Sequence, residues 1–148
     1  MVRTDSRPNI LFVIADDQSH PHASAYGCRF VSTPGFDRIA EEGIRFDNAY
    51  CAAPMCSPAR AAALTGLNMW RLEEASLLWG LFPKKLETYP AMLEAGGYRI
   101  GYTGQGWGPG NYERSGRSRN PAGPSFNDAT ETPPTTAQRG IDYFANFK

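Results

Sequence analysis

The chain has 148 residues, the size of one ordinary domain, and a globular chain of this length buries roughly two-thirds of its unfolded surface. Its 15 lysines and arginines balance 15 aspartates and glutamates, so we expect neither nucleic acid nor an anionic membrane surface as a partner. No stretch approaches the roughly 20 apolar residues of a membrane span, and residues 1–8 lack the apolar segment of a secretory signal. The localisation stays open: cytoplasmic for the chain as given, periplasmic or secreted if a leader was removed.

The first predicted element is a strand at residues 9–15, NILFVIA. Such a continuous apolar run with β-branched members is typical of a central parallel strand covered on both faces. A helix-start signal with a first-turn proline follows at residues 32–34, and Gly43 ends that helix. Residues 44–46 then have the pattern of a short strand.

Two further helices are predicted, each with its own end signal. The first covers residues 58–64, with a proline near its first turn and Gly66 just past its end. The second covers residues 89–95 and is stopped by a pair of glycines. A strand at residues 98–102 follows, and its pattern completes the order strand, helix, strand, helix, helix, strand.

This order predicts an α/β domain with a largely parallel central sheet flanked by helices. Ligands gather beyond the carboxyl ends of such strands, where Asp16, Asp17 and Gln105 would lie. Residues 104–134 are rich in Gly, Pro, Ser and Asn, so we expect a long loop over the site. Residues 136–148 have the pattern of a helix that is cut off before it finishes.

Two adjacent carboxylates, Asp16 and Asp17, directly follow the first predicted strand. When two carboxylates are buried side by side, they repel each other and lose hydration. This arrangement is costly unless a cation lies between them. Carboxylate oxygens favour calcium or magnesium over zinc. The alternative is a solvated turn without a metal. Nearby His20 and His22 are interpreted as exposed or structural, with the crevice as the alternative.

The second candidate feature is CSPAR at residues 56–60, continued by a helical run to Gly66. Cys56 precedes a proline-started helix, where backbone N–H groups and the positive helix end stabilise an anion. Arg60 lies one helical turn further on the same face and puts a fixed cation beside residue 56. The pattern therefore indicates an anion-binding nucleophile site, against the alternative of a buried cysteine before an ordinary helix.

The C-x-P-x-R motif, followed by Thr65 and Gly66 and preceded by the Asp16-Asp17 pair, resembles the sulfatase family. The resemblance runs from residue 8 to about residue 148. It implies an alkaline phosphatase-like fold, with residues 1–148 as the N-terminal part of a sulfatase catalytic domain. It also implies a sulfuric ester hydrolase that cleaves a sulfate ester or an N-sulfate.

The resemblance assigns roles to the matching residues. Cys56 would be oxidised by a formylglycine-generating enzyme, and one hydroxyl of the aldehyde hydrate would attack sulfur while the second drives release of sulfate. Asp16 and Asp17, with residue 56, would bind the divalent metal, calcium or alternatively magnesium. The metal would polarise the sulfate oxygens, and Arg60 would hold residue 56 and offset developing charge.

Sulfatases commonly carry a lysine and a histidine where this chain has Gln105 and Trp107. Gln105 can donate a hydrogen bond to a sulfate oxygen but carries no charge. Trp107 is interpreted as a stacking wall or a loop anchor, and an aromatic wall would suit a sugar substrate. Residues 106–110 and 120–127 resemble the branch related to heparan N-sulfatases, so we expect a sulfated sugar as the substrate.

Two other functions stay open from the sequence. The loss of a lysine and a histidine at Gln105 and Trp107 is compatible with a catalytically inactive or truncated relative that binds a sulfated glycan. The fold that the resemblance implies is also compatible with a hydrolase of phosphate or phosphonate esters.

Overall fold

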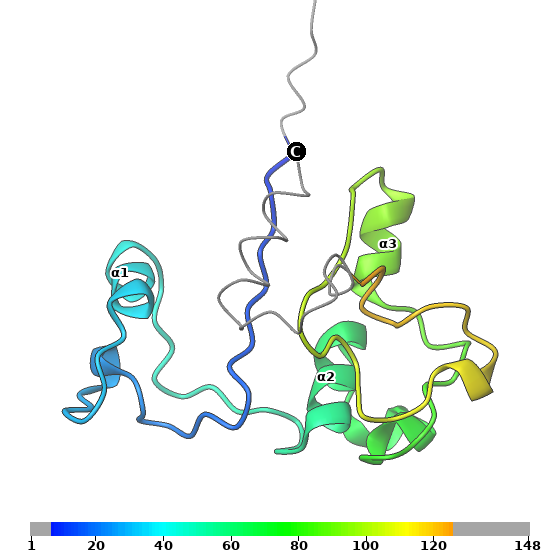
Figure 1. Cartoon of the computed structure of the whole chain (residues 1–148), viewed down its shortest axis with the longest axis horizontal. Helices are drawn as coiled ribbons and strands as arrows, with labels where there is room; N and C mark the ends of the chain where they lie inside the picture. Colours follow the sequence, from blue (N-terminus) through cyan, green and yellow to red (C-terminus); the bar gives the residue numbers. More distant parts are fainter. Residues whose placement is uncertain (1–6, 126–148) are drawn as a thin grey trace, which may run out of the picture. The chain divides into compact units, whose positions relative to one another are not determined.

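A computed structural model describes residues 7–125 of the chain (Figure 1). The chain divides into two compact units, Met1–Ala49 and Tyr50–Lys148, and each is described by itself. The predicted helix at residues 136–148 and the last part of the predicted loop, residues 126–134, lie outside the described residues. Within the described part, no helix combines the length and the apolar character that a bilayer crossing requires.

The first unit contains the 3-10 helix η1, Ser24–Tyr26, and the helix α1, Pro34–Glu42. The predicted helix start and end are confirmed: a proline opens α1, and the N–H of Gly43 donates to the carbonyl of Ile39 at 2.9 Å. Local signals fix this helix, because proline needs no hydrogen-bond partner in the first turn.

The carboxylate of Asp37 on α1 ties the helix to η1. The Ser24 hydroxyl donates to Oδ2 at 2.5 Å, the Ala25 N–H donates to Oδ1 at 2.8 Å, and the Thr33 hydroxyl donates to Oδ1 at 3.0 Å. These hydrogen bonds lower the pKa of Asp37 below its usual value, and the bond from Ser24 has the largest effect. The charged carboxylate therefore holds two turns of the chain together.

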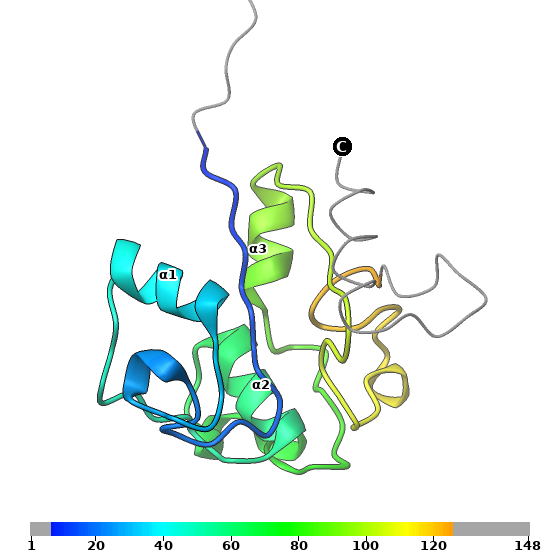
Figure 2. The ribbon, with the colours of Figure 1, turned by 60° about the vertical axis from the view of Figure 1, so that its left-hand side comes forward.

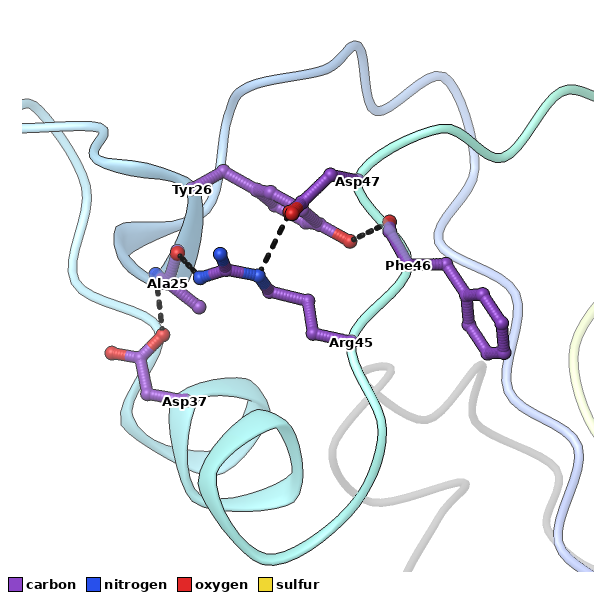
Figure 3. A network of polar contacts seen from close by, with 6 residues as sticks. All are labelled: Ala25, Tyr26, Asp37, Arg45, Phe46 and Asp47. Atoms are coloured by element: carbon purple, nitrogen blue, oxygen red, sulfur yellow. Dashed lines mark hydrogen bonds and ion pairs between the residues drawn. The ribbon is translucent and has the colours of Figure 1, made fainter.

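Arg45 makes a second connection from the segment after α1 (Figure 3). Its guanidinium donates to the Ala25 carbonyl at 2.6 Å and pairs with Asp47 at 2.9 Å. The Tyr26 hydroxyl donates to the carbonyl of Phe46 at 3.1 Å. The strand predicted at residues 44–46 is therefore wrong: these residues are irregular, and their polar groups bind η1 instead of a neighbouring strand.

The described residues contain no β-sheet, which corrects the predicted central sheet. Residues 9–15 form no regular structure, and the five apolar side chains from Ile10 to Ile14 are 44–74% exposed. Between residues 7 and 125, the β pairing consists of isolated parallel bridges, between Leu81 and Asn111 and between Tyr102 and Ser125. A strand needs a hydrogen-bonded neighbour along its length, and within residues 7–125 the segment 9–15 is assigned to no strand or bridge.

The second unit contains the helices α2, Cys56–Thr65, and α3, Tyr89–Ala95, which lie next to each other (Figures 1 and 2). Both predicted helices are confirmed, although α2 begins two residues before the predicted start. The described part of the unit also contains three short 3-10 helices: η2, Met69–Arg71; η3, Glu73–Ser76; and η4, Glu113–Ser115. The strand predicted at residues 98–102 is reduced to the single bridge at its last residue.

The core of the second unit joins α2 to segments far along the chain. Its buried side chains are Ala61, Leu64, Leu72, Ala75, Phe82, Leu86 and Trp107. The Phe82 and Trp107 rings meet edge to face with centroids 5.1 Å apart, a favoured aromatic geometry. The segment predicted as a loop over the site therefore contributes a large side chain to the core.

We predict that the Asp37 network makes the first unit sensitive to acid. Folding lowers the pKa of Asp37 below its ordinary value. The charged side chain therefore stabilises the unit fully above the ordinary carboxyl pKa of about 4. This stabilisation is lost as the pH falls through the lower pKa of the folded state. Asp37→Asn should speed amide hydrogen exchange of Ala25 at neutral pH, with a difference from wild type that narrows below about pH 4.

Glu41→Gln is the matched control, because that side chain is exposed on the same helix. It should leave the exchange of Ala25 unchanged at every pH. A difference between Asp37→Asn and wild type that stays constant from neutral pH into acid would contradict the role of the charged carboxylate.

Candidate active site

Cys56 is the first residue of α2 and is half-buried. Met55 before it is extended and makes no side-chain cap hydrogen bond. The first turn of the helix contains Pro58, and Gly66 ends the helix in the left-handed conformation at φ 68°. The sequence signals on both sides therefore place residue 56 at the positive end of the helix dipole.

Ser57, the next residue, is completely buried and connects α2 to two other segments. Its hydroxyl donates to the Leu78 carbonyl at 2.7 Å and accepts from the Gly110 N–H at 3.2 Å. Its backbone carbonyl accepts from the indole N–H of Trp107 at 2.9 Å. The residue beside the candidate nucleophile is therefore fixed from both sides.

The close packing at Gly110 leaves no room for a side chain. A Cβ atom there would lie 2.3 Å from a ring carbon of Trp107 and 2.6 Å from the Gly80 carbonyl oxygen. Gly110 can therefore bring its N–H close to Ser57 only because it lacks a Cβ.

Arg60 is half-buried one turn along α2. Its Nη1 donates to the carbonyl of Gly106 at 3.1 Å. The arginine of the motif thus contacts the loop that carries Gln105. The structure therefore brings the helix of Cys56 and the loop of Gln105 into contact within the second unit.

Gln105 is held inside its own loop. Its side-chain amide donates to the Gly108 carbonyl at 3.0 Å, whereas its Oε1 is buried without a hydrogen-bond partner in the described part of the chain. One of its two amide hydrogens is therefore used within the loop. This leaves one donor and no charge where a lysine is common in the family.

Trp107 lies in the core, with 1% of its surface exposed. Its ring packs on Phe82, and its indole N–H binds the first turn of α2. The loop-anchor interpretation is confirmed. The alternative, a wall for stacking a sugar, does not fit a ring whose faces are covered by the protein.

Asn120 is buried and was not identified from the sequence. Its Oδ1 accepts from the N–H groups of Trp107 and Ala122, each at 3.0 Å, and its Nδ2 donates to the Trp107 carbonyl at 2.8 Å. An asparagine in a segment rich in Gly and Pro has the pattern of a turn residue, so no sequence signal indicates this role.

Asp16 and Asp17 form an exposed turn in the first unit, directly after residues 9–15. Asp17 has φ 52°, in the left-handed region that aspartate enters more readily than most residues. The donor set fits calcium or magnesium, because both side chains are hard oxygen ligands open to solvent. The approach of this pair to residue 56 stays a prediction.

The two histidines near this turn differ in their surroundings. The His20 ring packs edge to face on Tyr26, with centroids 4.9 Å apart. His22 is exposed, and its carbonyl accepts from the side chain of Gln18 at 2.6 Å. Both histidines are exposed within the first unit, and the alternative that they face the crevice stays a prediction.

The family described as "Sulfatase" matches residues 8–147. The chain belongs to the sulfatase family. This membership implies an alkaline phosphatase-like fold, of which the helices are seen in the described residues and the sheet is not. No solved structure matches the chain.

Curated relatives match over most of this chain. The N-acetylgalactosamine-6-O-sulfatase of Bacteroides thetaiotaomicron is 35% identical over 114 residues, 72% of this chain and 22% of the relative. The N-acetylglucosamine-6-O-sulfatase of the same organism is 38% identical over 67% of this chain and 18% of its own length. Human arylsulfatase D is 38% identical over 67% of this chain and 18% of its own length. The chain spans about a fifth of the length of these sulfatases.

We predict that Ser57→Ala destabilises the second unit. The substitution leaves the Leu78 carbonyl and the Gly110 N–H without the hydroxyl that they bind. A buried group left unsatisfied costs about 1–3 kcal/mol. Urea unfolding should therefore show a lower free energy of unfolding by about that amount.

Ser76→Ala is the matched control, because Ser76 is only half-buried and its hydroxyl donates to the carbonyl of Glu73 within η3. Its effect should stay within about 0.5 kcal/mol. Equal effects of the two substitutions would show that Ser57 does not hold the segments together.

Proposed function

We propose that this chain is the N-terminal part of a sulfatase catalytic domain that hydrolyses a sulfate ester or an N-sulfate on a sugar. The observation that carries the proposal is the position of Cys56 as the first residue of α2, with Arg60 one turn further along the same helix. The sugar as substrate is supported by two relatives whose names specify N-acetylgalactosamine and N-acetylglucosamine sulfates.

Residue 56 is the proposed nucleophile. Converted to formylglycine by a formylglycine-generating enzyme, it would supply a hydrated aldehyde oxygen for attack on sulfur. The N-terminal end of α2 favours negative charge at this position, because the positive end of the helix dipole lies there. The guanidinium of Arg60 adds a permanent positive charge, which stabilises the charge that develops on the sulfate oxygens.

A divalent metal would be held by Asp16, Asp17 and residue 56. Calcium is the first choice and magnesium the alternative, because the two aspartates offer only hard oxygen ligands. When bound, the metal would polarise the sulfate oxygens. Two carboxylates and residue 56 do not complete the six to eight ligands that calcium takes, so further ligands would come from the rest of the enzyme.

Gln105 and Trp107 set a limit on what this part of the site contributes to the reaction. Gln105 can donate one hydrogen bond to a sulfate oxygen, because its other amide hydrogen binds Gly108. The indole of Trp107 binds Ser57 and has no acidic proton to give to a leaving alcohol or amine. Protonation of the leaving group is therefore assigned to residues outside this loop.

The same observation favours a second candidate, a relative that binds a sulfated glycan without cleaving it. Arg60 and the positive end of α2 would still attract a sulfate group, whereas no residue of the 105–108 loop would assist departure of the sugar. A third candidate, hydrolysis of phosphate or phosphonate esters, needs the same anion site. Turnover experiments separate these functions.

We predict that Cys56 is converted and is required for turnover. The full-length protein should be coexpressed with a formylglycine-generating enzyme, and mass spectrometry of the peptide that contains residue 56 should show the aldehyde. Sulfate esters and N-sulfated sugars should then be hydrolysed, whereas phosphate esters of the same alcohols should react at least about 100-fold more slowly if the charge arrangement is tuned to sulfate.

Cys56→Ala should abolish turnover, because it removes the nucleophile. Cys51→Ala is the matched control, because Cys51 is exposed and lies outside the motif, and it should leave turnover unchanged. A converted protein that binds sulfated sugars without turnover would instead identify the glycan-binding relative. Faster turnover of phosphate esters would identify the third candidate.

A further inference from the structure

We propose that Asn120 is a positioning residue for the nucleophile at position 56 and that it acts through Trp107. This inference rests on the proposed function, because it assigns a role in catalysis to residues that touch neither substrate nor metal. It follows from one chain of buried hydrogen bonds, which runs from Asn120 to Trp107 and from Trp107 to Ser57.

The first link is a pair of hydrogen bonds between the side chain of Asn120 and the backbone of Trp107. The side-chain amide accepts from the Trp107 N–H at 3.0 Å and donates to the Trp107 carbonyl at 2.8 Å. Both polar groups of one residue are thus bound by one planar side chain. The third bond, from the Ala122 N–H at 3.0 Å, fixes the amide itself and leaves little freedom of rotation.

The second link runs from Trp107 to α2. The indole N–H donates to the carbonyl of Ser57 at 2.9 Å, and Ser57 directly follows the nucleophile position. Edge-to-face packing on Phe82 fixes the plane of the indole. Ring and backbone are therefore both held, and a shift of Trp107 would move the first turn of α2.

Every member of this chain is buried: Ser57 is 0% exposed, Trp107 1% and Asn120 7%. Water cannot readily replace a lost partner at such positions, so the geometry of each bond depends on the next one. Arg60 adds a parallel connection, because it donates to the Gly106 carbonyl of the same loop. Helix α2 and the 105–110 loop are thus connected at both Ser57 and Arg60.

The position of residue 56 matters for the rate more than for substrate binding. A nucleophile displaced by about 1 Å can lose roughly 100-fold in rate, whereas the attraction between the sulfate and the charge of Arg60 falls only gradually with distance. Loosening the chain should therefore lower kcat and leave KM nearly unchanged.

The decisive variant is Asn120→Asp in the full-length, converted protein. The introduced carboxylate still accepts from the Trp107 N–H, but its other oxygen faces the Trp107 carbonyl and repels it. At neutral pH, kcat should fall about tenfold or more while KM changes less than about twofold. Rates are expressed per mole of aldehyde and are measured well below the melting temperature of each variant.

Acid should rescue this variant, which a loss of stability alone would not produce. Burial beside a carbonyl raises the pKa of the introduced carboxyl. Its protonated form again donates to the Trp107 carbonyl. The kcat of this variant, relative to wild type, should therefore recover as the pH falls from about 7 to about 5. The neighbouring charges, Arg119 and Glu94 of α3, are paired with each other at the surface. A kcat equal to that of wild type at neutral pH, or the absence of recovery in acid, would overturn the proposal.

Trp107→Phe tests the second link, because it keeps an aromatic ring against Phe82 and removes the N–H that binds Ser57. It should lower kcat in the same way but without recovery in acid. The matched controls are Trp70→Phe and Asn68→Asp, since Trp70 is 81% exposed and Asn68 is also exposed. Both controls should retain wild-type kcat and KM.

Hydrogen exchange keeps the inference separate from the proposed function. The peptide spanning residues 55–66 should exchange faster in Asn120→Asp and Trp107→Phe than in wild type. Its exchange rate should be unchanged in the two controls. A wild-type protein that carries the aldehyde but turns over no sulfate would refute the proposed function. In that case, faster exchange would still support the link from Asn120 to α2, and unchanged exchange would overturn it.

Discussion

The second unit depends on the burial of Ser57, where three segments of the chain meet. Its hydroxyl binds the segment of Leu78 and the N–H of Gly110, and its carbonyl binds the indole of Trp107. These groups are polar and shielded from water, so each must find its partner inside the protein. The same constraint places the candidate nucleophile, because Cys56 is the neighbouring residue on α2.

The helices of this chain could be predicted from its sequence because their signals are local. A proline in the first turn and a glycine after the last turn mark both α1 and α2, and the structure has these helices at the predicted places. α3 was predicted with its observed bounds, Tyr89–Ala95. The predicted start of α2 at Pro58 lies two residues inside the observed helix, because proline is accepted within a first turn as well as at its first residue.

The sheet could not be established in the same way, because a strand is a property of two segments. Residues 9–15 have a suitable pattern, but in the described part of the chain they belong to no strand or bridge. In the candidate site, the motif residues Cys56 and Arg60 were identified from their spacing. The buried role of Asn120 has no sequence signal, because two of its three hydrogen bonds join it to Trp107, thirteen residues earlier in the chain.

The packing at Gly110 restricts which sequences this fold can accept. A methyl group at this position would overlap both the Trp107 ring and the Gly80 carbonyl. The loop would have to withdraw from α2 to admit it, and the hydroxyl of Ser57 would lose its donor. Evolution can therefore vary the exposed tip of this loop, but replacement of this one glycine would require compensating changes in its aromatic neighbour and in the opposing backbone.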